Sequence, residues 1–352
     1  MEYKVIGLMS GTSLDGVDIA YCIFQQKENK WEFKIEKAET IEYQEEWRKK
    51  LRNIENSTAF DFVKTNIEYG IFLGNLVKNF IEKNQINPKL IGSHGHTIFH
   101  QPDQQITCQI GDGAMISAIS QLPVVCDFRK LDVALNGQGA PLVPIGDLLL
   151  FSDFPICLNI GGIANVSFDL NGIRIAFDIC PANMVLNFLS EKKGELFDSN
   201  GKMAKNGNLD EELLTKLNSL DFYNKNEPKS LGKEWVFQKI IPILNDSQIS
   251  IEDKLRTFSE HISFQIAKSL QKLEKSLNLL ITGGGAYNSF LVQKIQEKTH
   301  HNVVIPSKEI IDYKEALIFA FLALLRKNNQ INTLKSVTGA KKDSIGGCLY
   351  FN

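Results

Sequence analysis

The sequence predicts an α/β protein whose mixed sheets fall in two lobes. Its 352 residues exceed what one hydrophobic core usually serves, so we expect two domains. Each half opens with an apolar strand, a glycine-rich turn carrying small polar residues and a second strand, and helical patterns follow. The two matching units indicate an internal duplication. The mixture of strand and helix patterns indicates sheets flanked by helices.

The N-terminal half begins with a predicted β-hairpin. Residues 4–8 and 17–24 are apolar or alternating and flank the turn SGTSLDG, and a third strand is expected over residues 33–42. Apolar residues recur at helical spacing over residues 45–54 and 59–84. The segment KLIGSHGHTIFH is then expected to form a strand that runs into a loop.

A glycine- and proline-rich connection at residues 139–144 marks the expected domain boundary. It separates an N-terminal lobe over residues 1–140 from a C-terminal lobe over residues 141–352. The tail of the chain, residues 331–352, is expected to dock back on the first lobe.

The C-terminal half repeats the strand–turn–strand unit in PICLNIGGIANVS and continues through a strand at residues 173–177. Pro181 stands at the expected first position of the next helix. The segment LLITGGGAYNSFL reads as strand, glycine turn and helix. Further helices are expected over residues 209–219, 233–245, 251–277 and 314–327.

Composition and charge limit the classes of function. Hydrophobic residues make up 43% and charged residues 23% of the chain, and the formal net charge is -2, which gives no basis for nucleic-acid or membrane binding. The six cysteines are scattered without a C-x-x-C pair, so we expect reduced, buried thiols. With no leader pattern and no apolar run of bilayer length, the expected location is the cytoplasm.

Three glycine turns at strand ends carry the candidate chemistry: SGTSLDG, NIGGIANVS and TGGGAYN. A glycine turn lets backbone N–H groups converge on an anion because no Cβ blocks the approach, and Asp15 and Asp18 could hold a Mg²⁺ beside it. A single turn of this kind is more often a plain hairpin turn. Three of them predict a nucleoside triphosphate, with two turns on the phosphates and one under the nucleoside. P-loop, protein-kinase and dinucleotide-binding signatures are absent from the sequence.

Three charged residues are further candidates. Asp178 ends a strand just before a proline, where it could cap the following helix or act as a general base near the γ-phosphate. Arg129 follows a buried apolar run and could pair with a buried carboxylate or bind an acidic substrate. Glu315 heads an apolar helix, where a capping or dipole role is the simple explanation.

The histidines of GSHGHTIFHQP raise a separate alternative. His94, His96 and His100 share one face of a strand, so with Asp127 or Asp112 they could ligate zinc and form a hydrolase. Their spacing matches no zinc signature. The competing interpretation is that His94 hydrogen-bonds within its loop while His96 and His100 face solvent or substrate.

Together, these motifs resemble those of the anhydro-N-acetylmuramic acid kinases. The resemblance implies a two-lobed, duplicated ribonuclease H-like (actin-like ATPase) fold with mixed sheets flanked by helices. It also implies ATP and Mg²⁺ as cofactors, and a homodimer is expected because family members are often homodimers. The matching segments run from Ile6 to about Gly347 and are, in order, GLMSGTSLDGVD, GSHGHTIFHQP, QIGDGAMI, LPVVCDFRKLDVALNGQGAPLVP, LNIGGIANVS, FDICPANMVLN, PKSLGKEW, TGGGAYN, and SVTGA with a later IGG.

The resemblance also implies a reaction. Such enzymes use ATP to cleave the 1,6-anhydro ring of anhydro-N-acetylmuramic acid and phosphorylate O6, which gives N-acetylmuramic acid 6-phosphate during peptidoglycan recycling. Asp178 matches the catalytic aspartate, which would deprotonate the water that attacks C1. The family commonly has Gln, Thr-Gly and Asp where this chain has His96, Ile179-Cys180 and Asn187. The alternative is therefore a non-catalytic or weakly active ATP- and sugar-binding relative.

The expected site residues follow from the turns and the resemblance together. Residues 11–18 match the family's nucleotide-binding stretch, with Asp15 as the expected Mg²⁺ ligand. Arg129 and Glu315 match positions of the amino-sugar pocket, to which His94 and His96 are added. The expected nucleotide-binding residues are Gly11, Thr12, Ser13, Leu14, Asp15, Gly16, Val17, Asp18, Asn159, Gly161, Gly162, Asn165, Gly283, Gly284 and Gly285.

Overall fold

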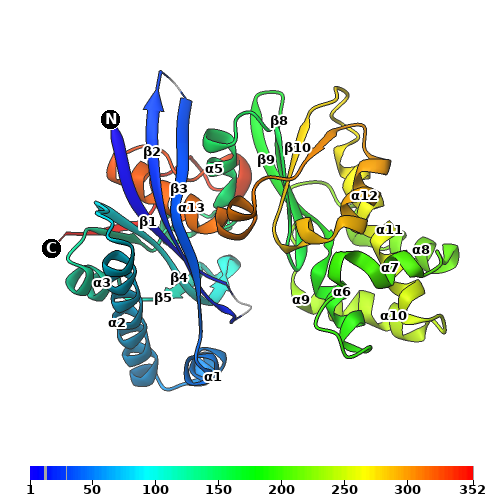
Figure 1. Ribbon diagram of the computed structural model, residues 1–352, viewed down its shortest axis with the longest axis horizontal. Helices are drawn as coiled ribbons and strands as arrows, with labels where there is room; N and C mark the ends of the chain where they lie inside the picture. Colours follow the sequence, from blue (N-terminus) through cyan, green and yellow to red (C-terminus); the bar gives the residue numbers. More distant parts are fainter. Residues whose placement is uncertain (12–13, 29, 352) are drawn as a thin grey trace. The chain divides into compact units, whose positions relative to one another are not determined.

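The computed structural model describes residues 1–11, 14–28 and 30–351 (Figure 1). The chain divides into two compact units. Each unit has its own mixed sheet with helices packed against it. Unit 1 comprises Met1–Leu150 with Tyr313–Asn352, and unit 2 comprises Phe151–Asp312.

This division differs from the expected boundary between residues 140 and 141. Helix α5 (Val143–Leu150) belongs to unit 1 because it packs against helix α13 (Lys308–Lys327). A Cβ on Gly146 would lie 2.7 Å from the side chain of Ile318, so the two helices are in close contact. Asp147 of α5 also forms a buried ion pair of 2.7 Å with Lys314 of α13.

Unit 1 is built on a seven-stranded mixed sheet in the order β12-β6-β4-β1-β2-β3, with β5 paired to β4. The predicted N-terminal hairpin forms as antiparallel β1 and β2, while β4 and β6 run parallel to β1. The prediction that the strand at residues 89–100 runs into a loop is wrong, because β4 stays paired with β5 up to Gln101. The terminal strand β12 pairs with β6. The strands are β1 (Glu2–Ser10), β2 (Gly16–Lys27), β3 (Lys30–Glu42), β4 (Leu90–Gln101), β5 (Ile106–Ile110), β6 (Val124–Cys126) and β12 (Cys348–Tyr350).

Helix α13 forms the centre of the unit 1 core. Every residue from 316 to 325 is buried. A Cβ on Gly7 of β1 would lie 1.8 Å from the Ala316 carbonyl oxygen, so only glycine lets the helix backbone approach the sheet this closely. The other helices of the unit are α1 (Glu45–Asn53), α2 (Ala59–Asn84), α3 (Gly113–Ser120), α4 (Lys130–Ala134) and α14 (Lys335–Thr338).

Unit 2 repeats the strand arrangement of unit 1. Its five-stranded sheet has the order β11-β10-β7-β8-β9, in which β7, β8 and β9 are antiparallel and β10 and β11 are parallel to β7. The series β3-β2-β1-β4-β6 of unit 1 has the same order and directions. The expected duplicated fold is therefore confirmed. The strands are β7 (Ile156–Ile160), β8 (Ile163–Leu170), β9 (Ile173–Pro181), β10 (Asn278–Thr282) and β11 (Asn302–Val304).

The helices of unit 2 differ in detail from the expected ones. Pro181 is the last residue of β9, and α6 begins at Asn183, so the proline does not start the helix. The long helix α11 ends at Leu270, because a turn follows it, and α13 begins at Lys308, earlier than predicted. The segment expected as a helix from 233 to 245 forms α9, a π-helical stretch (Val236–Ile240) and α10 in succession. The helices are α6 (Asn183–Glu191), α7 (Lys202–Asn206), α8 (Glu211–Asn218), α9 (Lys233–Trp235), α10 (Ile241–Asp246), α11 (Ile251–Leu270) and α12 (Ser289–Lys298).

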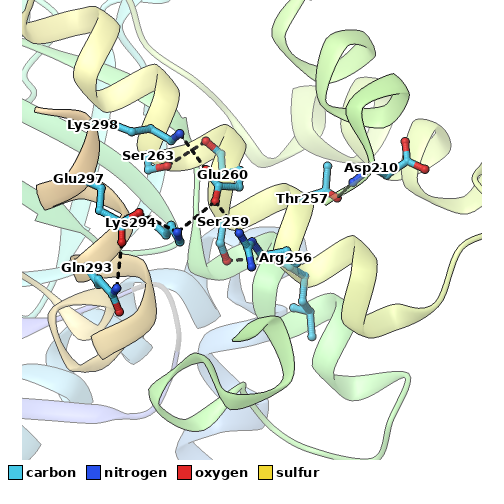
Figure 2. Close-up of polar contacts among 11 residues, drawn as sticks. Asp210, Arg256, Thr257, Ser259, Glu260, Ser263, Gln293, Lys294, Glu297 and Lys298 are labelled. Carbon is cyan, nitrogen blue, oxygen red and sulfur yellow. Dashed lines mark hydrogen bonds and ion pairs between the residues drawn. The ribbon is translucent and has the colours of Figure 1, made fainter. Parts of the chain in front are cut away.

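A buried carboxylate joins α11 to α12 (Figure 2). Glu260 of α11 contacts Arg256 at 3.2 Å on its own helix, and Lys298 at 2.8 Å and Lys294 at 3.5 Å on α12. Burial raises the pKa of Glu260, but the three cations outweigh it and the pKa is lowered overall. The ionised carboxylate therefore holds α12, which follows the third glycine turn, against α11.

Two expectations from composition can be compared with the structure. Cys22, Cys126, Cys157 and Cys180 are buried and free, but Cys348 is exposed because it lies on the short edge strand β12. None of the helices that the described residues form combines the length and the apolar character needed to cross a membrane.

Candidate active site

The first glycine turn joins β1 to β2 and is anchored from the end of β3. Gly11, Leu14 and Asp15 form the described part of the turn, while Thr12 and Ser13 lie outside the described residues. The backbone N–H of Tyr43 donates to the Asp15 carbonyl at 3.2 Å. The Asp15 side chain is exposed, which is the placement a carboxylate needs to reach a metal on a bound phosphate.

Gly16, Val17 and Asp18 begin strand β2 directly after this turn. Val17 is fully buried and serves the core, so its side chain does not reach a ligand. Asp18 is half-buried, and its Oδ1 accepts a hydrogen bond of 2.6 Å from the Thr40 hydroxyl. Among the described residues no cluster of three or more His, Cys, Asp or Glu could hold a metal, and Mg²⁺ on a nucleotide commonly takes only one or two carboxylates. Asp15 and Asp18 therefore stay the predicted carboxylates for such an ion.

Arg129 and His94 form a hydrogen-bonded pair in unit 1. Arg129 Nε lies 3.2 Å and its terminal nitrogen 2.9 Å from His94 Nε2, and the other terminal nitrogen donates to the Gly139 carbonyl at 2.7 Å. Since His94 Nδ1 contacts the Gly95 carbonyl at 2.9 Å, the ring is a neutral Nδ1–H tautomer that accepts at Nε2. Burial and the Arg129 charge both lower the pKa of His94, and burial lowers the pKa of Arg129 to about 10. The guanidinium therefore stays charged at neutral pH.

The loop that receives Arg129 is fixed by residues that the sequence reasoning did not single out. Asp132 is fully buried; its Oδ2 accepts from the Gly139 N–H at 2.7 Å and its Oδ1 accepts from the Thr338 hydroxyl at 2.7 Å. Thr338 belongs to the SVTGA motif of the tail. The sequence shows this motif, but it does not show the hydrogen bond from Thr338 to Asp132. The C-terminal segment thus positions the loop that holds Arg129.

Glu315 of α13 lies near Arg129 and Asp18 in unit 1. The side chain of Glu315 keeps access to solvent. Its pKa is raised overall, mainly because surrounding protein atoms remove water from the carboxyl group. The charge of Asp18 also raises this pKa, and the charge of Arg129 lowers it. Glu315 therefore lies within electrostatic reach of Arg129 and Asp18. This placement is inside the helix, so the simple capping role does not apply.

The histidines do not form a metal site. His94 Nε2 is taken by Arg129, His96 Nδ1 contacts the Ser10 hydroxyl at 2.9 Å, and His100 Nδ1 contacts the Thr107 hydroxyl at 3.1 Å. The suggested fourth ligands are also engaged: Asp127 pairs with Lys130 and Asp112 caps α3. The zinc alternative is therefore wrong.

Described residues of unit 1 line a larger and a smaller cavity. A cavity of about 460 Å³ between α1 and α2 is lined by charged residues such as Lys49, Lys64 and Glu46, and by none of the site candidates. A smaller cavity of about 230 Å³ is lined by residues of β4, β5 and β6, among them His94, and by Asp127 directly after β6. His94 therefore connects the Arg129 group to the smaller cavity.

The second glycine turn, Gly161-Gly162, joins β7 to β8 and holds the start of α6. The Gly161 carbonyl accepts from the Asn183 N–H at 3.1 Å, and the Gly162 carbonyl accepts from Ala182 at 2.8 Å and Met184 at 3.2 Å. A Cβ on either glycine would meet nothing closer than 3.6 Å, so the backbone of the turn is not crowded by its neighbours. An anion can therefore approach the backbone there.

The third turn packs against the second. A Cβ on Gly283 would lie 2.6 Å from Asn159 Oδ1, and one on Gly285 would lie 2.2 Å from Ile160 Cγ2. Only glycine fits at Gly285, because any side chain would overlap Ile160. Gly284 between them is exposed. Unit 2 therefore brings two of the predicted turns into one surface.

Asp178 lies on β9 opposite Asn165 of β8, next to a bulge. Ala164 pairs with Cys180 and Asn165 with Asp178, so Ile179 is the extra residue on β9. Such bulges redirect neighbouring side chains and are common beside active sites. Asp178 does not cap α6, which begins at Asn183.

The surroundings of Asp178 tune its carboxyl group. The group is half-buried, and burial raises its pKa to about 6, against the opposing hydrogen bond of 2.8 Å from the Leu231 N–H to Oδ2. The Asp178 backbone N–H donates to the Lys229 carbonyl at 3.0 Å. A carboxyl group with a pKa near neutrality is suited to general-base chemistry.

The family model for anhydro-N-acetylmuramic acid kinase matches residues 3–352. The chain belongs to the anhydro-N-acetylmuramic acid kinase family. Curated relatives with that name include those of Mannheimia succiniciproducens (34% identical, covering 99% of both chains) and Haemophilus influenzae (35% identical, covering 98% of this chain and 97% of the relative). A relative of the same name from Bacillus thuringiensis subsp. konkukian is 32% identical over 99% of both chains.

Membership in the anhydro-N-acetylmuramic acid kinase family confirms the resemblance expected from the motifs. It also shows that the chain is a kinase-family enzyme over nearly its whole length. The residue roles within the family remain predictions; the buried side chain of Val17 does not fit its predicted role in nucleotide binding.

Proposed function

We propose that this protein uses ATP to open the 1,6-anhydro ring of anhydro-N-acetylmuramic acid and phosphorylates O6, giving N-acetylmuramic acid 6-phosphate. The observation that carries the proposal is Asp178, a half-buried carboxyl group whose pKa is raised to about 6, on strand β9, which pairs with the strand that follows the second glycine turn. The names of the curated relatives supply the substrate. This step would place the enzyme in the recycling of peptidoglycan in the cytoplasm.

In the proposed chemistry, Asp178 takes a proton from a water molecule as that water attacks C1 of the sugar. The C1–O6 bond breaks, and the released O6 attacks the γ-phosphorus of ATP, so that ADP leaves. The atoms balance: the sugar, ATP and water give the 6-phosphate and ADP, with the proton on Asp178 passing to solvent. Ring opening thus produces the nucleophile where it is needed, which is a proximity effect.

The three glycine turns are the proposed nucleotide site. The uncrowded backbone at Gly161-Gly162 and the turn that begins at Gly11 suit the phosphates, and Gly283 to Gly285 suit the nucleoside. Asp15 and Asp18 would hold Mg²⁺, which neutralises charge on the phosphates when it is bound.

The proposed sugar site comprises Arg129, His94, His96 and Glu315. The charged guanidinium of Arg129, fixed by His94 and Gly139, can pair with the carboxylate of the substrate's lactyl group. Glu315 lies close enough to Arg129 for the two charges to influence each other's pKa. A homodimer is proposed as the assembly and is tested by light scattering of the purified chain.

Reaction in H₂¹⁸O tests the mechanism. If Asp178 activates water at C1, the label appears on the anomeric oxygen of the product and none enters the phosphate. Because anomeric oxygens exchange slowly with water, the label is measured early and compared with unlabelled product incubated alone. Label in the phosphate would mean that water attacks ATP directly, and would contradict the proposal. The ionisable carboxyl group of Asp178 favours turnover over the non-catalytic alternative.

A further inference from the structure

A chain of buried hydroxyl groups ends on His96 in unit 1. Ser10 Oγ lies 2.6 Å from Tyr43 Oη and 2.9 Å from His96 Nδ1, and Tyr43 Oη is hydrogen-bonded to Tyr69 Oη. All four side chains are buried. They come from separate elements: Ser10 ends β1, Tyr43 follows β3, Tyr69 is in α2 and His96 is in β4. We name these four residues the hydroxyl relay.

Proton counting fixes the direction of the hydroxyl relay. Its three hydroxyl groups each carry one proton, and three hydrogen bonds join its members. In the part of the chain that the structure describes, Tyr69 and Tyr43 have no side-chain acceptor outside the relay. If His96 Nδ1 carried a proton, one buried hydroxyl would therefore lack an acceptor, which is unfavourable. Every group is satisfied when Tyr69 donates to Tyr43, Tyr43 to Ser10, and Ser10 to His96 Nδ1.

We infer that the hydroxyl relay locks His96 as a neutral Nε2–H tautomer, which presents one uncharged N–H donor to the sugar. Ser10 and Tyr43 are then positioning residues, and His96 is a specificity residue. The inference rests on the proposed function, since it assigns a ligand to a member of the proposed sugar site. His94, two residues away, has the opposite tautomer because Arg129 donates to its Nε2.

Further observations agree with a neutral donor at His96. Burial lowers the pKa of His96 to about 4, so the ring is uncharged at neutral pH. No described residue accepts a hydrogen bond from His96 Nε2, so this N–H is available to a ligand. Hydroxyl, ether and acetamido oxygens of an amino sugar are uncharged acceptors that such a donor suits, whereas a phosphate is better served by a cation.

The hydroxyl relay also connects His96, whose N–H is the proposed hydrogen-bond donor to the sugar, to the first glycine turn. Ser10 directly precedes Gly11, and the Tyr43 backbone N–H donates to the Asp15 carbonyl. Tyr43 therefore holds the turn on both sides, through its hydroxyl group at Ser10 and through its backbone at Asp15.

Nitrogen-15 NMR of the histidine rings in the full chain, without substrate, tests the tautomer directly. The His96 signals are assigned by their loss in His96→Gln. At pH 7 we expect Nε2 to be protonated and Nδ1 to be unprotonated. In Ser10→Ala the Nδ1 signal should move further from the protonated position, because the unprotonated nitrogen no longer accepts a hydrogen bond from the Ser10 hydroxyl. Tyr69→Phe is the matched control and should leave the tautomer unchanged, since Tyr43 and Ser10 can still donate in the same direction. A protonated Nδ1 in the wild type, or no change in Ser10→Ala, would overturn the inference.

Steady-state kinetics test the role of the donor. His96→Gln keeps an acceptor for Ser10 and an N–H donor for the sugar, so kcat/KM for the sugar should stay within about threefold of wild type. His96→Met has a similar length but no donor and should lower kcat/KM for the sugar about tenfold, with KM for ATP unchanged. Equal losses in the two variants, or a change in KM for ATP alone, would contradict the assignment. Absence of turnover in the wild type would count against the proposed function, while the NMR result would still decide the tautomer.

Discussion

Replacing Asp178 by Asn removes the proposed proton acceptor but keeps the size and shape of the side chain. The amide oxygen of Asn can still accept the hydrogen bond from the Leu231 N–H, which is 2.8 Å long in the native protein. The variant should therefore fold normally and bind ATP almost as the wild type does. Loss of a general base typically lowers kcat by about 10²–10⁴-fold, and this is the loss we expect.

The pH dependence of the wild type should report the same carboxyl group. The base works only when it is ionised, and burial raises its pKa to about 6. The rate should therefore be nearly full above pH 7 and fall as the pH drops through 6, by roughly tenfold between pH 7 and pH 5. An unperturbed aspartate would keep its charge, and the rate its value, down to about pH 5.

A coupled assay of ADP release, with saturating sugar and ATP, measures both effects. Asp246→Asn is the matched control, because it makes the same chemical change at an exposed site in the same unit and should leave kcat unchanged. If Asp178→Asn kept more than about a tenth of the wild-type kcat, the assignment of the base would be wrong. A wild-type profile that is flat from pH 5 to pH 8 would instead contradict the raised pKa.

Other parts of the structure give further predictions. Asp15→Ala should raise the Mg²⁺ concentration needed for half-maximal rate, measured by titration, and an unchanged titration would leave Asp15 only a role in the turn. Arg129→Lys should raise KM for the sugar about tenfold in steady-state kinetics, because one ammonium group cannot bridge His94 and Gly139 as the guanidinium does. Glu260→Gln should lower the free energy of unfolding by about 2 kcal/mol at pH 7, measured by urea denaturation. Since the pKa of Glu260 is lowered in the folded state, this difference should be present above about pH 5 and should shrink at lower pH.

The sequence predicted the local elements well because their signals are local. Alternating and apolar runs around SGTSLDG predicted β1 and β2, and helical spacing predicted α2 with its observed bounds, Ala59–Asn84. The repeated strand–turn–strand units predicted the duplication, which the matching strand orders confirm. The glycines of the third turn were also visible as a motif, although not the contact with Ile160 that requires Gly285.

The unit boundary and the contacts of the site depended on residues far apart in the chain. Helix α5 joined unit 1 because α13, which comes more than a hundred residues later, packs against it. Asp132 fixes the loop at Gly139 only with the help of Thr338 from the tail. A strand pattern could not show that β9 continues through a bulge at Ile179 to Pro181, so that α6 begins only at Asn183.

What the sequence by itself determined was the chemical inventory: three glycine turns, a carboxyl group at a strand end, and histidines beside an arginine. What only the tertiary structure decided was the protonation state of those groups. Asp178 acquires its pKa near 6 from burial, His94 accepts a hydrogen bond because Arg129 reaches it, and His96 becomes a donor because Ser10 occupies its other nitrogen. Protonation depends on hydration and on hydrogen-bond partners, and both are set by the atoms that folding brings around a group rather than by its neighbours in the chain.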